Sequence, residues 1–245
     1  MQIIGGYARR NSVTFLSENY IATASRTGNG LITVSMRNRY LASARNPLFR
    51  LLTRVPFVRG IVALLTVLLQ SKPIALLLGA SIVVSLLPET TSNSLANQAL
   101  VYLDFVLGAG ALVLVGLNFY RFRDVKKYHG AEHKAANAFA QTHEISVEAA
   151  SQGSRVHERC GTNFLAIIAM VATIVQLVTN WDVDYSVLIG FGVAGEVVKL
   201  RNTSVKKPFL WVGGQMQKYL TTAEPSEREI EVAVAALKAL SEAEI

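Results

Sequence analysis

Charged residues and cysteine are scarce in this chain of 245 residues, and both shortages narrow the class of protein. Only 17% of the residues are Asp, Glu, Lys or Arg, whereas 51% are hydrophobic, a balance too apolar for an ordinary soluble domain. The single cysteine, Cys160, excludes an internal disulfide. With no Walker loop, no convincing dinucleotide-binding glycine motif and no G-x-S-x-G elbow, the common nucleotide-binding and serine-hydrolase sites are not predicted either.

The basic residues that give the chain its formal net charge of +7 are unevenly distributed. Lys and Arg form three blocks, nine in residues 1–59, seven in residues 121–160 and seven after residue 198, and the apolar stretches between these blocks contain only Lys72. This pattern is typical of the cytoplasmic segments of a membrane protein rather than of a nucleic-acid-binding surface. We therefore expect membrane lipid as a partner and no nucleic acid.

Four apolar zones separate or follow the basic blocks, at residues 60–88, 98–120, 162–181 and 185–198. Lys72-Pro73 divides the first zone, which is either one kinked helix or a short span beside an interfacial helix. The segments 89–97 and 182–184 contain no Lys or Arg, which places them on the outer side of the membrane. The sequence thus predicts a multi-pass cell-membrane protein with about four spans and with both termini in the cytoplasm.

The predicted fold is mainly α, a polytopic helical membrane protein with three regions. Residues 1–55 form a cytoplasmic β-rich region, because Asn29-Gly30 lies between two runs rich in β-branched residues, a strong hairpin signal. Residues 56–200 form a membrane domain that includes a cytoplasmic, histidine-bearing segment, 121–160. Residues 201–245 form a cytoplasmic tail whose amphipathic helix begins after Ser226, with Glu229 completing a capping box.

Two of the four histidines, His129 and His133, lie four residues apart in the segment KYHGAEHK. Residues i and i+4 share one face of a helix, so both rings can point at one ion, and Glu132 lies on the same side. H-x-x-E-H is the inverzincin pattern, in which two histidines bind zinc and the glutamate takes a proton from metal-bound water. The pattern predicts a zinc site, or one for another divalent transition metal, with Glu132 as catalytic base. Gly130 and Ala131 between the ligands predict a close approach to another backbone.

Three further residues are candidate ligands, and they lead to different sites. Glu196, inside the last apolar zone, would complete a His₂Glu set and leave a position open, as in catalytic zinc sites. His157 and Cys160, at H-x-x-C spacing, would together close the site, as in structural zinc sites. Glu196 also has an alternative role as the ion-pair partner of Lys199 or Arg201. The sequence leaves this choice open.

Several segments resemble the YqhQ-type family of bacterial membrane proteins, a domain of unknown function. The similar segments are PFVRGIVAL, YHGAEHKAANAF, HERCGTNFL, GEVVKL and LTTAEPSEREIEVAVAAL, which together extend from residue 56 almost to the end of the chain. The resemblance implies a predicted metal-dependent enzyme whose site residues correspond to His129, Glu132, His133, His157, Cys160 and Glu196. The N-terminal segment departs from the family pattern, and the chain is shorter before the histidine motif.

These observations favour a membrane-embedded, metal-dependent hydrolase with its site at the cytoplasmic face. Amide hydrolysis of a protein or peptide substrate is the expected reaction, by analogy with other H-x-x-E-H enzymes. One alternative is a non-enzymatic scaffold in which a structural metal fixes the central segment to the helices. A second alternative is ion or solute transport that uses Asp104 and Glu196 as charges inside the membrane. The sequence specifies neither the substrate nor the oligomeric state.

Overall fold

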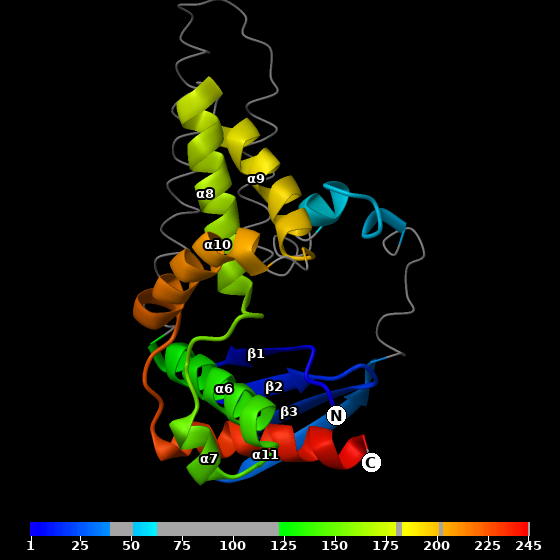
Figure 1. Ribbon diagram of the computed structural model, residues 1–245. Helices are drawn as coiled ribbons and strands as arrows, with labels where there is room; N and C mark the ends of the chain where they lie inside the picture. The colour runs from blue at the N-terminus through cyan, green and yellow to red at the C-terminus, as the bar shows by residue number, and fades with distance from the viewer. Residues whose placement is uncertain (40–50, 63–122, 180–182, 201–202, 245) are drawn as a thin grey trace, which may run out of the picture. The chain divides into compact units, whose positions relative to one another are not determined.

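The computed structural model describes residues 1–39, 51–62, 123–179, 183–200 and 203–244 of the chain (Figure 1). The chain divides into two compact units, one formed by Met1–Ile61 with Arg123–Ile245 and the other by Val62–Phe122. The first unit contains the histidine motif and is the one described below. Most of the predicted zone 60–88 and all of zone 98–120, with Asp104, lie outside the described residues.

The N-terminal region is a four-stranded antiparallel sheet in the order β1-β2-β3-β4. Its strands are β1 Gly5–Arg9, β2 Ser12–Leu16, β3 Tyr20–Arg26 and β4 Ile32–Asn38. The predicted hairpin is confirmed, since β3 pairs with β4 across the Asn29-Gly30 turn, where Gly30 has a φ of 88°. Glycine adopts that left-handed conformation without the steric cost of a Cβ.

The rest of the described chain is helical. Its elements are α6 Arg123–Thr142, α7 Val147–Gln152, α8 Gly161–Thr179, α9 Val183–Val197, α10 Thr203–Met216, the π-helical turn η1 Gln217–Thr221, and α11 Glu227–Ala243. The predicted start of α11 is confirmed. The backbone N–H and hydroxyl of Ser226 donate to Glu229 Oε2 at 2.7 and 2.6 Å, which is the expected contact between the N-cap and the N3 side chain.

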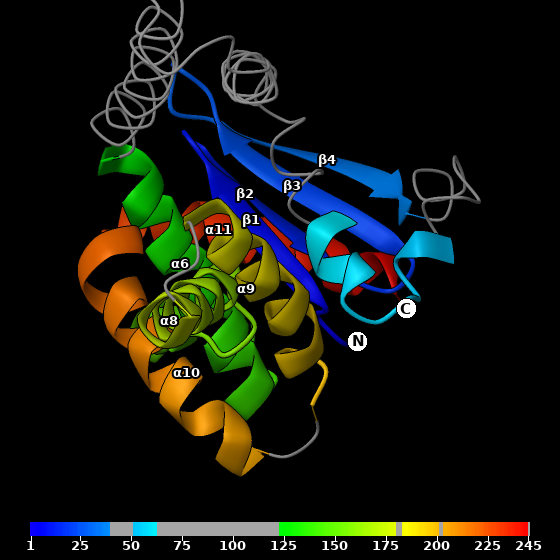
Figure 2. The same ribbon diagram turned by 90° about the horizontal axis from the view of Figure 1, so that it is seen from above.

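A shared core joins the sheet to α6 and α11, which pack against it as a second layer (Figures 1 and 2). Alternate residues of the strands, Val13 and Phe15 on β2 and Ala22 and Ala24 on β3, are fully buried in this core. Small residues on both helices, many of them alanines, allow the two layers to approach closely. The core therefore unites the N-terminal region, the histidine-bearing segment and the tail, three parts that sequence patterns alone treat separately.

Helices α8 and α9 pack side by side through a second cluster of buried side chains, which includes Ile168 and Ala194 (Figure 1). They account for most of the predicted apolar zones 162–181 and 185–198 and are mainly apolar, although α9 also contains Asp184 and Glu196. Within the described part of the chain, α8 alone is both long and apolar enough to cross a membrane, and the apolar stretch of α9 is shorter. Two of the four predicted spans are thus helical, and one of these two has membrane-spanning length.

Candidate metal centre

Helix α6 carries the histidine motif and is held tightly in place by the core. Tyr128, Ala131 and Ala135 are buried in the core that α6 shares with the sheet and α11. The expected close approach at Gly130 is present, because a Cβ at this position would overlap the carbonyl oxygen of Ala223, just before α11. The helix is therefore fixed against a passing backbone at the same turn that carries the two histidines.

His129 is oriented by a backbone carbonyl of η1. Its Nδ1 lies 3.0 Å from the carbonyl oxygen of Thr221, so this nitrogen carries the proton and donates it. The proton on Nδ1 leaves the lone pair on Nε2, the atom that then faces Glu132 and Cys160. A carbonyl acceptor behind the ring is the arrangement that typically fixes a metal-binding histidine.

His133 has the same arrangement and is almost completely buried. Its Nδ1 donates to the carbonyl oxygen of Arg155 at 2.7 Å, and its ring centroid lies 4.4 Å from that of His129. Burial, reinforced by the nearby His129, lowers the pKa of His133 to about 3. The ring is therefore neutral at physiological pH, the state in which an imidazole can bind a metal.

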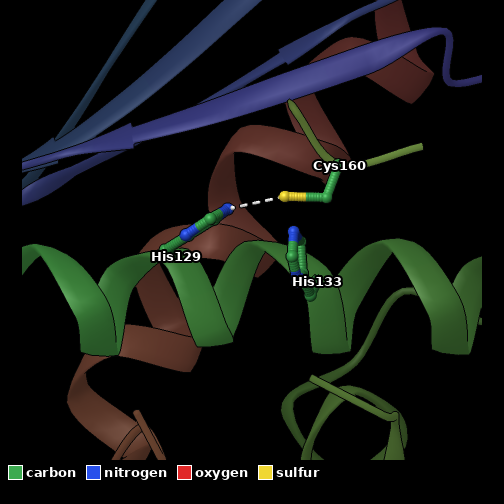
Figure 3. Close-up of side chains that lie close together, drawn as sticks. All are labelled: His129, His133 and Cys160. Atoms are coloured by element: carbon green, nitrogen blue, oxygen red, sulfur yellow. Dashed lines mark hydrogen bonds between the residues drawn. The ribbon is translucent and has the colours of Figure 1, made fainter. Parts of the chain in front are cut away.

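Cys160 brings the third donor atom, from the residue immediately before α8 (Figure 3). Its Sγ lies 3.5 Å from His129 Nε2 and accepts from the backbone N–H of Thr162 at 3.4 Å. Burial raises the pKa of the Cys160 thiol, so the thiolate needs a nearby positive charge to form. A divalent metal at this position would supply that charge.

The ligand atoms of His129, His133 and Cys160 all lie within 4.8 Å of one another. A tetrahedral zinc ion with bonds of about 2.0–2.3 Å holds its ligand atoms roughly 3.3–3.8 Å apart. Small side-chain shifts would therefore bring the three ligand atoms to the spacing that one zinc ion requires. Two imidazoles and one thiolate suit zinc and leave a fourth position open. The described residues contain no other such group of His, Cys, Asp or Glu.

Glu132 lies beside this group with its carboxylate buried. Its Oε2 has no hydrogen-bond partner in the described part of the chain and is 3.9 Å from His129 Nε2. Burial raises the pKa of Glu132 to about 8. Strand β1 leaves room for the carboxylate, because a Cβ at Gly6 would overlap Glu132 Oε1. A buried carboxyl beside three metal-ligand atoms has the position expected of a proton-transfer group, and a cation held by those atoms would favour its ionised, proton-accepting form.

His157 is near the group but outside it. Its ring centroid is 5.5 Å from that of His133, and burial lowers its pKa. The backbone N–H of His157 donates to the fully buried Gln217 at 2.8 Å, a bond that fixes the loop leading to Cys160. The structure therefore brings one member of the predicted His157–Cys160 pair, Cys160, into the three-residue group.

Glu196 is engaged elsewhere, at a contact between α9 and the distant segment 51–62. Its Oε1 accepts from Arg59 Nε and from the backbone N–H of Phe57, each at 2.7 Å, and Oε2 pairs with Arg59 Nη2. Among the described residues the ion-pair partner is thus Arg59 rather than Lys199, and Arg201 lies outside the described residues. The structure does not bring Glu196 together with the two motif histidines.

Several residues that support the site carry no signal in the sequence. Lys134 Nζ donates to the carbonyl oxygens of Ser151 and Gly153, at 2.8 and 3.1 Å, and also pairs with Glu224. Asn137, one turn further along α6, donates to two carbonyls of the loop that leads to Cys160. Their partners are mostly backbone carbonyls, which every sequence possesses, so only the fold reveals them.

Comparison with known proteins gives a family but no activity. The model of the DUF1385 family, described as a protein of unknown function, matches residues 66–243. The uncharacterized protein YqhQ of Bacillus subtilis (strain 168) is 36% identical over 135 residues, which cover 48% of this chain and 42% of that protein. The chain thus aligns with less than half of this relative. No solved structure matches.

Proposed function

This chain belongs to the DUF1385 family of proteins of unknown function, and we propose that it is a membrane-bound, zinc-dependent hydrolase. His129, His133 and Cys160 would bind the metal and leave its fourth position to water or substrate. The observation that carries the proposal is the convergence of three ligand atoms from two distant segments within 4.8 Å. The buried carboxyl of Glu132 beside them, whose Oε2 has no hydrogen-bond partner among the described residues, supports an enzyme rather than a scaffold.

The chemistry of the site follows from the two carbonyl-oriented imidazoles and the buried carboxylate. A zinc ion held by His129, His133 and Cys160 would supply Lewis-acid chemistry, activating water and polarising the carbonyl of a substrate. Glu132 accepts the proton of the attacking water and returns it to the leaving amine, so that one amide bond is hydrolysed. The thiolate of Cys160 and the imidazoles of His129 and His133 would hold the cation. A protein or peptide is the simplest substrate with such a bond.

The proposal also places the protein in the cell membrane. Helix α8 has the length and composition of a membrane span, and the histidine-bearing segment and the residues after 198 carry basic residues. Basic segments beside spans lie on the cytoplasmic side, so we place the metal centre at the cytoplasmic face of a multi-pass protein.

Elemental analysis of the purified full chain tests the metal centre. We expect about one zinc per chain in the wild type and little in His133→Ala and Cys160→Ser, because each change removes one of three ligands. His157→Ala is the matched control, since its ring lies outside the group of ligand atoms, and it should retain zinc. Cobalt substitution gives a second readout, a sulfur-to-metal charge-transfer band that Cys160→Ser abolishes. Wild-type protein without stoichiometric metal would contradict the proposal.

Glu132→Gln separates the enzyme from a scaffold that uses the same metal structurally. The variant keeps the size of the side chain but removes its ability to accept a proton, so we expect zinc content and thermal stability to be retained. Hydrolysis should fall by about 10²–10⁴-fold, the usual contribution of a general base. Unchanged turnover in a zinc-loaded variant would favour the scaffold.

A further inference from the structure

A cavity of about 530 Å³ lies next to the candidate metal centre, and Cys160 belongs to both. Its walls come from Ile4, the loop before α8, the first turns of α8, the end of α9 with Val198 just after it, and α10. Its volume is within the range of about 300–1,000 Å³ that is typical of small-molecule pockets. A ligand in this cavity would therefore contact the residue that is proposed to hold the metal.

The polar and apolar parts of the lining come from different segments. The loop contributes Glu158, Arg159 and Cys160, whereas the helices contribute mainly apolar side chains, namely Phe164, Ile167, Val197, Val198, Phe209 and Leu210. Asn163 also lines the cavity, but its amide is already bonded to the loop carbonyls of His157 and Glu158 and to Gln217. The helical walls therefore favour a ligand that is a hydrocarbon, and the loop favours a polar group.

Two cations border the cavity and favour an anionic or strongly polar head group. Arg159 Nη1 donates to the carbonyl oxygen of Ile3 and Lys206 Nζ donates to that of Val198, so both side chains are held in place. Among the described residues that line the cavity, Glu158 is the only acidic one. Of the three helices in the wall, α8 has membrane-spanning length and exposes Leu177 and Val178, so hydrocarbon chains of lipid would surround it.

We propose that this cavity binds one fatty-acyl chain of the substrate and places its polar head group beside Cys160. The proposal rests on the proposed function, because it makes an amphiphile with a fatty-acyl amide bond the substrate class of the same metal centre. Three features favour an amphiphile over a plain peptide. The cavity has an apolar wall, two fixed cations border it, and Cys160, the candidate metal ligand, lines it. The hydrolysed bond then lies near the polar end of the chain.

Photolabelling tests the acyl-chain site in the full chain reconstituted into phosphatidylcholine nanodiscs. The probe is palmitic acid with a diazirine on its hydrocarbon chain, and the labelled residues are mapped by mass spectrometry. We expect label on Phe164, Phe209 or Leu210 that excess unlabelled palmitate suppresses at least fivefold. Label on Leu177 should not be suppressed, because that side chain is 78% exposed and would meet bulk lipid.

Two cavity-filling variants and one control complete the test. Val198→Trp and Leu210→Trp reduce the space inside the cavity at residues that are not fully buried, and either should lower the saturable label at least fivefold. Leu177→Trp adds the same bulk outside the cavity and should leave the label unchanged. Zinc content is measured in parallel. Retained zinc without saturable label refutes the acyl-chain site alone, whereas saturable label without zinc refutes the metal-dependent hydrolase and leaves the acyl-chain site standing.

Discussion

At the scale of single residues, the candidate centre depends on carbonyl oxygens as much as on side chains. The carbonyls of Thr221 and Arg155 accept from the Nδ1 atoms of the two motif histidines, and in both rings this places the lone pair on Nε2. Neither acceptor is distinguished by its side chain. Substitutions at Thr221 or Arg155 should therefore affect metal binding only where they displace the backbone.

The buried carboxyl of Glu132 makes the stability of the metal-free protein depend on pH. Its folded-state pKa of about 8 is far above the usual value near 4.3, so folding favours the protonated acid. Its contribution to stability is complete below the unfolded pKa and is lost as pH rises toward 8, since the unfolded chain ionises first. Each unit of pKa difference corresponds to about 1.4 kcal/mol.

Glu132→Gln removes this titration, which gives a testable difference between two metal-free proteins. We expect the variant to melt at a higher temperature than the wild type at pH 8.5, and the gap to shrink as the pH falls toward 4.5. Thermal melts of the two chelator-treated proteins at several pH values measure this difference in melting temperature. A gap that does not vary with pH would mean that the carboxyl is not buried as described.

Sequence patterns predict some of the site residues well and others poorly. The i, i+4 spacing places His129 and His133 on one face of a helix, because that relation depends only on helix geometry. The choice of a third ligand depends on the fold, and Glu196 has a nearer partner in Arg59. Arg59 is separated from Glu196 by 137 residues, so no local pattern relates the two.

At the scale of elements, α6 and the segment before α11 approach each other closely at the turn that carries the two motif histidines. Gly130→Ala would force the Ala223 carbonyl away from α6 and displace Thr221, the acceptor for His129. We expect zinc affinity to fall by about 10–100-fold, the usual effect of losing an outer partner of a metal-binding histidine. Competition with a chromophoric chelator measures this affinity.

Gly214→Ala in α10 is the matched control for Gly130→Ala. A Cβ at Gly214 meets only Val156 Cγ1, at 3.4 Å, an ordinary contact. Alanine in a helix is favoured over glycine by about 0.5–1 kcal/mol, so the control should be neutral or slightly stabilising. Equal zinc affinity in both variants would show that the approach at Gly130 does not support the site.

The hairpin β3–β4 and the start of α11 follow from local chemistry, which explains why sequence patterns find them. Asn29-Gly30 fits a tight turn, and Ser226 with Glu229 satisfies the first N–H groups of a helix. The packing of α6 and α11 against the sheet is different, because an alanine-rich helical face is compatible with many surfaces. That pairing is set by the whole core and has no local signature.

At the scale of the whole molecule, the core beneath the sheet should control whether the metal centre exists. Leu237 on α11 is 1% exposed and lies in the cluster that joins α11 to α6 and the sheet. Leu237→Ala should lower the free energy of unfolding by about 2–5 kcal/mol, through lost burial and a residual cavity. Urea-induced zinc release should then occur at a lower denaturant concentration.

Lys238→Ala, the neighbouring exposed position, is the control for Leu237→Ala and should change the same free energy by less than about 0.5 kcal/mol. If both variants release zinc at the wild-type urea concentration, the centre is independent of the core. That result would contradict the arrangement in which α6 is positioned by α11.

The pairing of the N-terminal sheet with α11 also sets an order of events during translation. Val13 and Phe15 on β2 lie in one cluster with residues of α11, and Ser17 Oγ donates to Glu244 Oε1 at 2.5 Å across 227 positions of the chain. At about 5–20 residues per second, the ribosome needs roughly 10–50 s to synthesise the stretch between them. The nascent sheet therefore waits with one face uncovered, and a chaperone that shields exposed strands during this interval should raise the yield of folded protein.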